Sequence, residues 1–532
     1  MPFSTEIQKI INSSSYRIFA GDGFVDSGNG LEIDRIIQKE GKNIILSLRV
    51  RKASKKPVKI YSFVVAEFIL SAPISISKVL ENNWLQCSEI SYKNLDYSTK
   101  KNTLFLQRDQ NPYSFQKEYG YIDGSIISEW FTSIKFNGET LFIGAVTTAD
   151  QFSQMFIKKT ESGVVIRVTC QYDGLTLNPG QVVTSEKIFF GIGEEDKIQK
   201  EFARSLAKHM KVGEIALPIK AMCCSYYWNG NKISEESINK ELDVLESLPE
   251  RLDLDYFQLD AGYTRYFGDW LDYKERFPDG FEPIIKRIKS LGYKPGIWIS
   301  PFSINPGTKL HDHHPGWLLK DIDKKHFEGR LTSPFDTMSD YIDLEVLDPT
   351  NPEVKSYLRE VLTHFKNLGF ELFKTDFTYP VCLASKFSRS VTRAQALREG
   401  FQFIRDTLGD VKLISCITQL SPVVGLIDYV RTGIDTLNPF VVNVPGLDKL
   451  VNEFMLESNL NESKRRSFLN GIVWRADPDM LIFRKGTGIL ESTLLKHRKM
   501  AEENNMCLWI GDSVANMDES TKMKVLEFFN KN

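Results

Sequence analysis

Two charged residues stand at the end of one short segment of the chain. Within Gly369–Thr378, the run Leu372–Thr375 predicts a short buried strand, and Lys374 and Asp376 stand two residues apart at its end. Residues two apart on a strand point to the same face, so both side chains can enter one cavity. The ammonium group favours an ionised carboxylate, which is the form that a carboxylate nucleophile needs at neutral pH. The alternative is a salt bridge at the surface end of a strand.

Polar and aromatic residues also accompany the other predicted strands of this half of the chain. They are Tyr226, Tyr227, Trp228, Asp260, Trp298, Cys416, Arg431, Asp435, Asp477, Asp479 and Asp512, with Asp477 and Asp479 expected just before the seventh strand. Carboxylates, one lysine and one arginine supply hydrogen-bond partners for hydroxyl groups, and the aromatic rings supply faces for stacking. Two carboxylates across a cavity are the minimum that glycoside hydrolysis requires.

The elements that must position these residues alternate between strand and helix. The predicted strands are Ala221–Trp228, Tyr256–Leu259, Lys294–Ile299, Leu372–Thr375, Lys412–Ser415, Asp428–Arg431, Met480–Phe483 and Cys507–Ile510. This alternation over residues 206–532 predicts a (β/α)8 TIM barrel, whose active site lies at the C-terminal strand ends. Residues 1–205 contain many short β-branched or alternating runs between turn residues, which predict an N-terminal β-sandwich domain. The expected fold class is therefore α/β, a TIM barrel preceded by a β-sandwich.

The composition narrows the classes of partner. The chain has 532 residues with 67 Lys+Arg and 69 Asp+Glu, so neither nucleic acid nor a membrane is expected as a partner. The 7 cysteines are odd in number and scattered, and we find no signal peptide, which favours a cytoplasmic location. His311–His314 resembles a metal cluster but lacks strict ligand spacing, so no metal and no cofactor are expected. The sequence leaves homo-oligomer formation open.

Ten segments of the second half occur in the order and spacing of one known family. They are Cys224–Tyr227, Phe257–Tyr263, Gly268–Leu271, Phe277–Gly280, Pro295–Phe302, His314–Trp317, Asp348–Pro352, Phe373–Phe377, Val423–Thr436 and Asp477–Asp479. Through them, residues 220 to 512 resemble the clan D α-galactosidases, specifically glycoside hydrolase family 36. This family also places a β-sandwich before its barrel. The resemblance implies an enzyme that hydrolyses an oligosaccharide or glycoside substrate.

The resemblance also implies a role for particular residues. Asp376 falls on the family's nucleophile and Asp435 on its general acid/base, while Asp260, Trp298, Lys374, Cys416 and Arg431 fall on positions that contact the galactose ring. The implied reaction is a retaining double displacement, for which the two carboxyl groups are expected about 5 to 5.5 Å apart. The acid/base must stay protonated beside an anionic neighbour, so its pKa is expected to be raised.

The sequence departs from the family pattern at several points. Ala261 stands where the family has a second aspartate after strand two, so another side chain from His311–His314 or 336–341 is needed if the sugar's 4- or 6-hydroxyl is to find a partner. The bulkier Ile417 and Gln419 stand in the family's Gly-Cys-Gly-Ser-Pro segment after strand five. Little or no C-terminal β-domain is expected.

Alternatives to these interpretations remain. The substrate sugar can be a relative of galactose, namely an α-N-acetylgalactosaminide, a β-L-arabinopyranoside or an α-glucoside, and the reaction can be transglycosylation. A sugar-binding protein without catalysis is the alternative from another class. Each residue also has a structural alternative: loop aspartates that cap helices, a core tryptophan or a buried thiol. For Asp477 and Asp479 the structural role is the preferred one.

Overall fold

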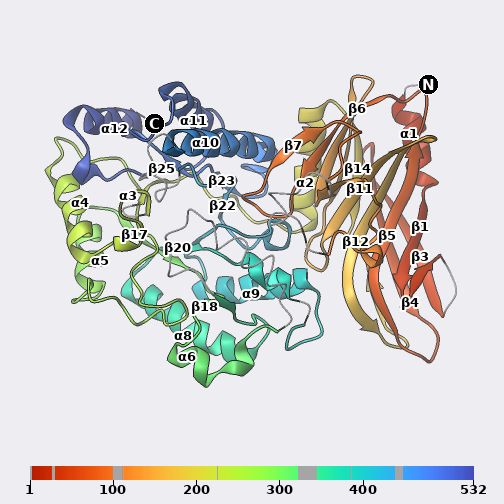
Figure 1. Ribbon diagram of the computed structural model, residues 1–532, viewed down its shortest axis with the longest axis horizontal. Helices are drawn as coiled ribbons and strands as arrows, with labels where there is room; N and C mark the ends of the chain where they lie inside the picture. Colours follow the sequence, from red (N-terminus) through yellow and green to blue (C-terminus); the bar gives the residue numbers. More distant parts are fainter. Residues whose placement is uncertain are drawn as a thin grey trace.

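The computed structural model describes residues 3–26, 30–99, 111, 113–223, 226–320, 344–384, 386–437 and 447–531. An antiparallel β-rich part precedes a part in which parallel strands alternate with helices, and Figure 1 shows the two side by side. Cys224 and the segment 336–341 lie outside the described residues. No helix in the described ranges is both long and apolar enough to cross a membrane.

The N-terminal part is built from two antiparallel sheets. The first has the strand order β2-β1-β5-β12-β11-β8, and the second has the order β13-β4-β14-β10-β9-β6-β7 with β3 paired to β4. The strands are β1 (Ser15–Ala20), β2 (Gly23–Val25), β3 (Leu31–Glu40), β4 (Asn43–Lys52), β5 (Val58–Leu70), β6 (Ile76–Asn82), β7 (Ile90–Lys93), β8 (Ile126–Glu129), β9 (Phe131–Phe136), β10 (Glu139–Ala145), β11 (Ser153–Thr160), β12 (Gly163–Leu177), β13 (Val182–Thr184) and β14 (Ile188–Gly193). A short helix, α1 (Phe3–Asn12), precedes them.

The helix α2 (Glu195–His209) packs directly on the second sheet. Two glycines of this sheet allow the close approach, because a Cβ on Gly144 would lie 2.6 Å from Phe202 and one on Gly191 would lie 2.4 Å from Ile198. The Phe202 ring also lies 6.3 Å from that of Phe468 in the second part of the chain. The helix therefore stands between the two parts, as Figure 1 shows.

The second part is a closed parallel barrel. Its sheet has the order β23-β22-β21-β20-β17-β16-β15-β25-β24. The strands are β15 (Lys220–Cys223), β16 (Tyr256–Leu259), β17 (Lys294–Ile299), β20 (Leu372–Thr375), β21 (Lys412–Ser415), β22 (Tyr429–Arg431), β23 (Arg475–Asp477), β24 (Met480–Leu481) and β25 (Leu508–Ile510). Since β23 pairs with β22 and β24 pairs with β25, these two segments are the halves of one interrupted strand that closes the ring. The predicted TIM barrel after a β-sandwich is confirmed.

The seventh barrel strand begins earlier than predicted. The prediction started it at Met480 and put Asp477 and Asp479 before it, but Asp477 is already part of β23. Pro478 lacks an N–H group and Asp479 has a φ of 75°, so the strand is interrupted at these two residues. The prediction of its start was therefore wrong, because a proline inside a strand splits the hydrophobic pattern.

Helices surround the barrel strands. They are α3 (Tyr226–Asn229), α4 (Glu235–Ser247), α5 (Glu282–Ser290), α6 (Lys309–His313), α8 (Pro352–Leu368), α9 (Arg393–Leu408), α10 (Leu447–Arg466), α11 (Glu491–Glu503) and α12 (Glu519–Lys531). Ser234 caps α4, since its side chain accepts a hydrogen bond from Ser237 N. A short two-stranded sheet of β18 (Ser303–Ile304) and β19 (Glu345–Val346) lies beyond the third barrel strand.

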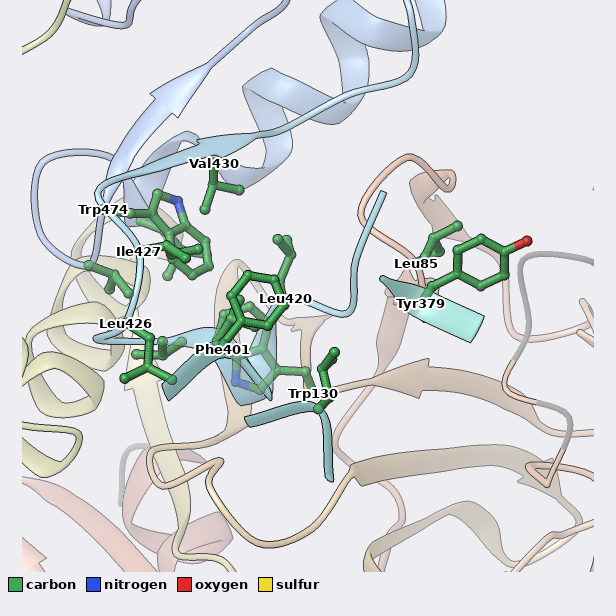
Figure 2. Close-up of a cluster of buried hydrophobic side chains, with 14 of the residues drawn as sticks. Leu85, Trp130, Tyr379, Phe401, Leu420, Leu426, Ile427, Val430 and Trp474 are labelled. Atoms are coloured by element: carbon green, nitrogen blue, oxygen red, sulfur yellow. The ribbon is translucent and has the colours of Figure 1, made fainter. Parts of the chain in front are cut away.

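One continuous apolar core spans both parts of the chain. Figure 2 shows a portion of it, in which Leu85 and Trp130 of the β-sandwich gather with Tyr379, Leu420 and other side chains of the barrel. The indole rings of Trp130 and Trp474 lie 6.0 Å apart. The two parts are therefore joined by a buried interface.

Candidate active site

A pocket opens at the C-terminal ends of the barrel strands. Its volume is about 400 Å³ including the open mouth. It is lined by Tyr226, Tyr227, Asp260, Ala261, Trp298, Lys374, Asp376, Phe377, Cys416, Ile417, Arg431, Asp435 and Met480. All seven residues to which the resemblance gives a catalytic or sugar-binding role are among them, so the structure brings these residues together at the rim where a TIM barrel holds its active site. Of the other residues selected at the strand ends, Tyr226 and Tyr227 line the pocket, whereas Trp228, Asp477, Asp479 and Asp512 do not.

Asp376 is held rigidly where β20 ends. Its backbone N–H donates to Ile299 O at 2.9 Å, while its carboxylate accepts from Phe377 N at 2.8 Å and from Trp298 Nε1 at 3.0 Å. Burial raises the pKa of Asp376 to about 6, against the opposing effects of the Lys374 ammonium and the indole N–H. The carboxyl group is thus oriented by two donors and is mostly ionised at neutral pH.

The ion pair of Lys374 is with Asp260. Lys374 Nζ lies 2.9 Å from Asp260 Oδ2, and both side chains are buried. Burial alone would raise the pKa of Asp260, but the lysine and the donors Ala261 N and Gln258 Nε2 lower it overall. The lysine was expected to keep Asp376 in the ionised form. It does act in that direction, and although burial outweighs it and raises the pKa of Asp376 to about 6, the carboxyl group is still mostly ionised at neutral pH.

Arg431 links the second candidate catalytic residue to the interrupted strand. Its Nη2 lies 2.5 Å from Asp435 Oδ1 and 2.7 Å from Asp479 Oδ2, and its Nη1 lies 3.9 Å from Cys416 Sγ. The Asp435 side chain is 35% exposed, whereas that of Asp479 is fully buried. Burial raises the pKa of Asp435, Arg431 opposes this rise, and the Asp479 carboxylate adds to it.

Asp479 has contacts around the pocket that the sequence did not predict. It accepts hydrogen bonds from Tyr227 Oη at 2.5 Å and from Thr436 N at 2.7 Å. Thr436 directly follows Asp435, so Asp479 fixes the backbone that carries the second carboxyl group. The Asp-Pro-Asp segment was the available signal, but nothing local in it indicates which residues Asp479 contacts.

The histidine-rich segment lies away from the pocket lining. His311 bonds to Asp312 and to Glu345, and the His314 ring stacks on Trp317 with centroids 3.9 Å apart. Within the described ranges no group of three or more His, Cys, Asp or Glu side chains could hold a metal ion. Of the segments expected to compensate for Ala261, His311–His314 contributes no lining residue and 336–341 lies outside the described residues.

The arrangement provides two carboxyl groups of different character in one pocket. Asp376 is anchored by an indole and a backbone amide, and Asp435 is held by a guanidinium group and partly exposed. Carboxyl groups in such contrasting surroundings can divide the roles of nucleophile and acid. The buried Lys374–Asp260 pair adds a polar wall that can bind hydroxyl groups.

Comparison with known proteins identifies relatives of this chain. Residues 241–397 match the family model Melibiase. An alpha-galactosidase of Escherichia coli is 34% identical over 91 residues, which is 15% of this chain and 13% of that protein. Alpha-galactosidase C of Emericella nidulans is 25% identical over 216 residues, 36% of this chain and 26% of that protein. The chain thus aligns with about a quarter or less of the length of these curated relatives.

A solved structure covers nearly the whole chain. TtGalA, an alpha-galactosidase from Thermus thermophilus in complex with p-nitrophenyl alpha-D-galactopyranoside, matches with a TM-score of 0.67 and 18% identity. The match covers 93% of this chain and 94% of that one. This likeness confirms the fold. The resemblance found in the sequence is confirmed by the match of residues 241–397 to the Melibiase family model and by the similarity to curated alpha-galactosidases.

Proposed function

We propose that this protein is a retaining α-galactosidase that hydrolyses terminal α-galactosides through a glycosyl-enzyme intermediate. The observation that carries the proposal is the pocket lined by both Asp376 and Asp435, with the buried Lys374–Asp260 pair in the same wall. The match of residues 241–397 to the Melibiase family model supports the same reaction. The pocket lies at the C-terminal ends of the barrel strands, where TIM-barrel enzymes hold their substrates.

The proposed reaction proceeds in two displacements. An Asp376 carboxylate oxygen attacks the anomeric carbon, the bond from that carbon to the leaving oxygen breaks, and Asp435 gives its proton to that oxygen. In the second step Asp435 takes a proton from water, the water oxygen attacks the anomeric carbon, and Asp376 leaves as a carboxylate. The two inversions add up to retention of configuration.

The charges of the pocket support this division of roles. Asp376, with a pKa of about 6, is mostly ionised near pH 7, and burial together with Asp479 favours the protonated form of Asp435. When Asp376 becomes an ester, its negative charge disappears from the pocket. The pKa of Asp435 then falls, which suits its change from acid to base.

The remaining pocket residues are assigned to the sugar itself. Asp260 and Lys374 offer a carboxylate and an ammonium group to ring hydroxyls, and Arg431 presents donors beside Asp435. Trp298 both orients Asp376 and offers an apolar wall, while Cys416 lines the pocket beside Arg431. A charge-assisted hydrogen bond to a hydroxyl contributes about 1.5–3 kcal/mol.

A second candidate substrate follows from Ala261. This residue lines the pocket next to Asp260, and its methyl group cannot accept a hydrogen bond. A sugar that lacks the 6-CH2OH group of galactose does not need that partner, which favours a β-L-arabinopyranoside. An α-N-acetylgalactosaminide, an α-glucoside or transglycosylation fits the same two-step chemistry.

A panel of nitrophenyl α- and β-glycosides tests the proposal. Turnover of the α-galactoside with the α-anomer of galactose as first product, followed by NMR, is the expected result. A preference for the arabinopyranoside would select the second candidate, and binding without turnover would indicate a sugar-binding protein. TtGalA has been solved in complex with stachyose, so this oligosaccharide belongs in the panel.

The Asp376→Ala variant tests the role of the nucleophile. Without this carboxylate no glycosyl-enzyme forms, so we expect hydrolysis to be lost. Azide can fill the space left by the Asp376 carboxylate and attack an activated substrate from that side. This single displacement gives the inverted glycosyl azide. Near-normal activity of the folded variant, or a retained azide product, would assign the nucleophile to another residue.

A further inference from the structure

A loop of the β-sandwich reaches the barrel rim beside the pocket. The segment Asn82–Ser88 connects β6 to β7, and it has the unusual property of being polar yet almost wholly buried. Gln86 is 1% exposed and Leu85 is 1% exposed. A buried polar loop must satisfy its hydrogen bonds within the protein, so the partners of Gln86 show what it holds.

Gln86 bridges the loops that follow two neighbouring barrel strands. Its Oε1 accepts from Ile417 N at 2.8 Å, and its Nε2 donates to Gly433 O at 3.0 Å. Its own backbone N–H donates to Thr418 O at 3.1 Å. One side chain from the sandwich thus joins the loop after β21 to the loop after β22.

Both loops carry residues of the pocket. Ile417 and the preceding Cys416 line it, and Gly433 stands two residues before Asp435. Ile417 has a φ of 39°, a left-handed conformation that is strained for a β-branched residue and persists only where the surroundings impose it. The hydrogen bond from its N–H to Gln86 is one such constraint.

Arg466 also connects the Asn82–Ser88 loop to the segment Thr432–Asp435, which ends at the proposed acid/base. From the end of α10, its Nη1 donates to Gln86 O at 2.8 Å and to Thr432 O at 2.9 Å. Its Nη2 donates to Asn82 Oδ1 at 3.3 Å and to Ser88 O at 3.1 Å. The segment Thr432–Asp435 is therefore connected to the sandwich twice, through Gln86 and through this arginine.

Apolar packing surrounds these polar contacts. Leu85 belongs to the same buried cluster as Tyr379, which stands three residues after Asp376, and Figure 2 draws the two together. The Trp84 ring lies 5.8 Å from that of Phe152 within the sandwich. Hydrogen bonds shielded in this way from water are stronger than exposed ones.

We infer that Gln86 is a positioning residue for catalysis: the β-sandwich, through this side chain, sets the place of Asp435 and of the pocket wall at Ile417. The inference rests on the proposed function, because it assigns Asp435 the role of acid/base. Gln86 itself does not line the pocket, so it acts only through the loops that it holds. A displaced carboxyl group protonates the leaving oxygen less efficiently.

The test uses Gln86→Met and Gln86→Glu in the 532-residue chain. Methionine keeps the size but makes neither hydrogen bond, and glutamate keeps the acceptor for Ile417 N while losing the donor to Gly433 O. We expect kcat on an α-linked disaccharide to fall about tenfold to a hundredfold in Gln86→Met, with a much smaller change in KM. Gln86→Glu should keep more activity than Gln86→Met if the strained Ile417 backbone is the more important partner.

A comparison of two substrates with different leaving groups distinguishes a positioning role of Gln86 from a loss of folded protein. A dinitrophenyl glycoside needs little acid assistance, so its first step should be nearly normal in both variants, while the disaccharide is hydrolysed poorly. Equal losses on the two substrates, or no loss at all, would overturn the inference. If Gln86→Met does not fold, Gln86→Glu decides the question by the same ratio.

Two control variants test whether any change at the interface between the sandwich and the barrel has the same effect. Ser88→Ala changes the same buried loop at a hydroxyl group that makes no hydrogen bond in the described structure. Asp173→Asn weakens a different contact between sandwich and barrel, its 2.8 Å ion pair with Arg393, away from the pocket. Neither should alter the ratio between the two substrates. A changed ratio in Asp173→Asn would mean that any loosening of the interface has this effect.

The activity of the wild-type protein on the glycoside panel tests the proposed function separately from the Gln86 inference. If the wild-type protein turns over another glycoside of the panel, the same ratio is measured on that sugar and the inference is still tested. If the wild type turns over none, the proposed function fails, and the Gln86 inference fails with it. Activity in the wild type with unchanged ratios in the variants overturns the inference alone.

Discussion

At the residue scale, the two candidate catalytic carboxyl groups differ in how they are held. Asp376 accepts hydrogen bonds from Trp298 Nε1 and from a backbone amide, so both of its oxygens are fixed. Asp435 has one guanidinium partner, and its side chain is 35% exposed. A nucleophile must point at one atom of the substrate, whereas an acid/base must serve a leaving group and then a water molecule, so the second needs access to solvent.

The raised pKa of Asp376 predicts the acid side of the pH profile. Because this pKa is about 6, the ionised nucleophile is lost as the pH falls through that value, and kcat/KM should fall with it. Trp298→Phe removes the indole donor, which acts to lower this pKa, so the acid side should move to higher pH. The measurement is kcat/KM against pH for an activated aryl glycoside. An acid side near pH 4 in the wild type, or no movement in the variant, would contradict the assignment.

The methyl group of Ala261 predicts weak selection at carbon 4 or 6 of the sugar. Ala261→Asp places a carboxylate beside Asp260 in the pocket wall, where it can accept from a hydroxyl. The ratio of kcat/KM for an α-galactoside over an α-glucoside or an arabinopyranoside should rise about tenfold or more. Ala261→Leu, which has a similar shape but no acceptor, is the control. An unchanged ratio in the folded aspartate variant would place the hydroxyl elsewhere.

At the element scale, the interruption of the seventh barrel strand has a chemical effect. The residue with φ 75° is Asp479, whose side chain meets Arg431 inside the barrel. A regular strand would turn successive side chains to opposite faces, and the break allows this one to reach both Arg431 and the amide of Thr436. The interruption therefore places a buried carboxylate close to Asp435, the candidate acid/base.

Asp479→Asn should move the alkaline side of the pH profile to lower pH. The Asp479 carboxylate raises the pKa of Asp435, and its removal also leaves Arg431 to act on Asp435 alone. Both effects lower the pKa of Asp435, so its protonated form is lost at a lower pH. The side-chain amide oxygen of the asparagine can still accept the hydrogen bond from Thr436 N. Asp477→Asn is the matched control, since it removes a neighbouring carboxylate that does not contact Arg431 or Asp435 in any described ion pair. Equal shifts in the two variants would contradict the specific role of Asp479.

Sequence patterns predicted elements better than contacts between them. Strand ends identified Asp260, Lys374, Asp376 and Arg431, because a parallel barrel directs all such ends to one rim. The pairing of Lys374 with Asp260 was not predicted. The two residues are 114 positions apart, and several other carboxylates were expected at the same rim. Gln86 carried no signal at all, because a single glutamine in a sandwich loop resembles any surface glutamine until the fold buries it.

At the scale of the whole molecule, the two parts are held by buried polar anchors as well as by apolar packing. Arg393 at the start of α9 makes a 2.8 Å ion pair with Asp173 and a 3.0 Å hydrogen bond with Asn111 Oδ1. Its guanidinium group also lies 3.8 Å from the centroid of the Tyr113 ring. All three partners belong to the N-terminal part, so this arginine connects the barrel to the sandwich.

Arg393→Met should destabilise the protein strongly. The substitution leaves the Asp173 carboxylate without its buried cation, and breaking a buried pair in this way costs about 3–5 kcal/mol. We expect a lower Tm than in the wild type and unfolding in two separate transitions, measured by calorimetry. Arg389→Met is the control, because Arg389 is exposed and should change the stability by less than about 0.5 kcal/mol. Equal effects of the two variants would show that Arg393 is no anchor.

The place of the Asn82–Ser88 loop in the chain has a consequence for biosynthesis. Domains generally fold in the order in which the ribosome releases them, so the sandwich and its loop exist before the barrel is complete. The ring closes only when β25 (Leu508–Ile510) joins β15 and β24, after all the other barrel strands have been made. A nascent chain therefore carries Gln86 long before it carries Asp435, and we expect activity to appear only after the ring has closed, without a partly active barrel as a precursor.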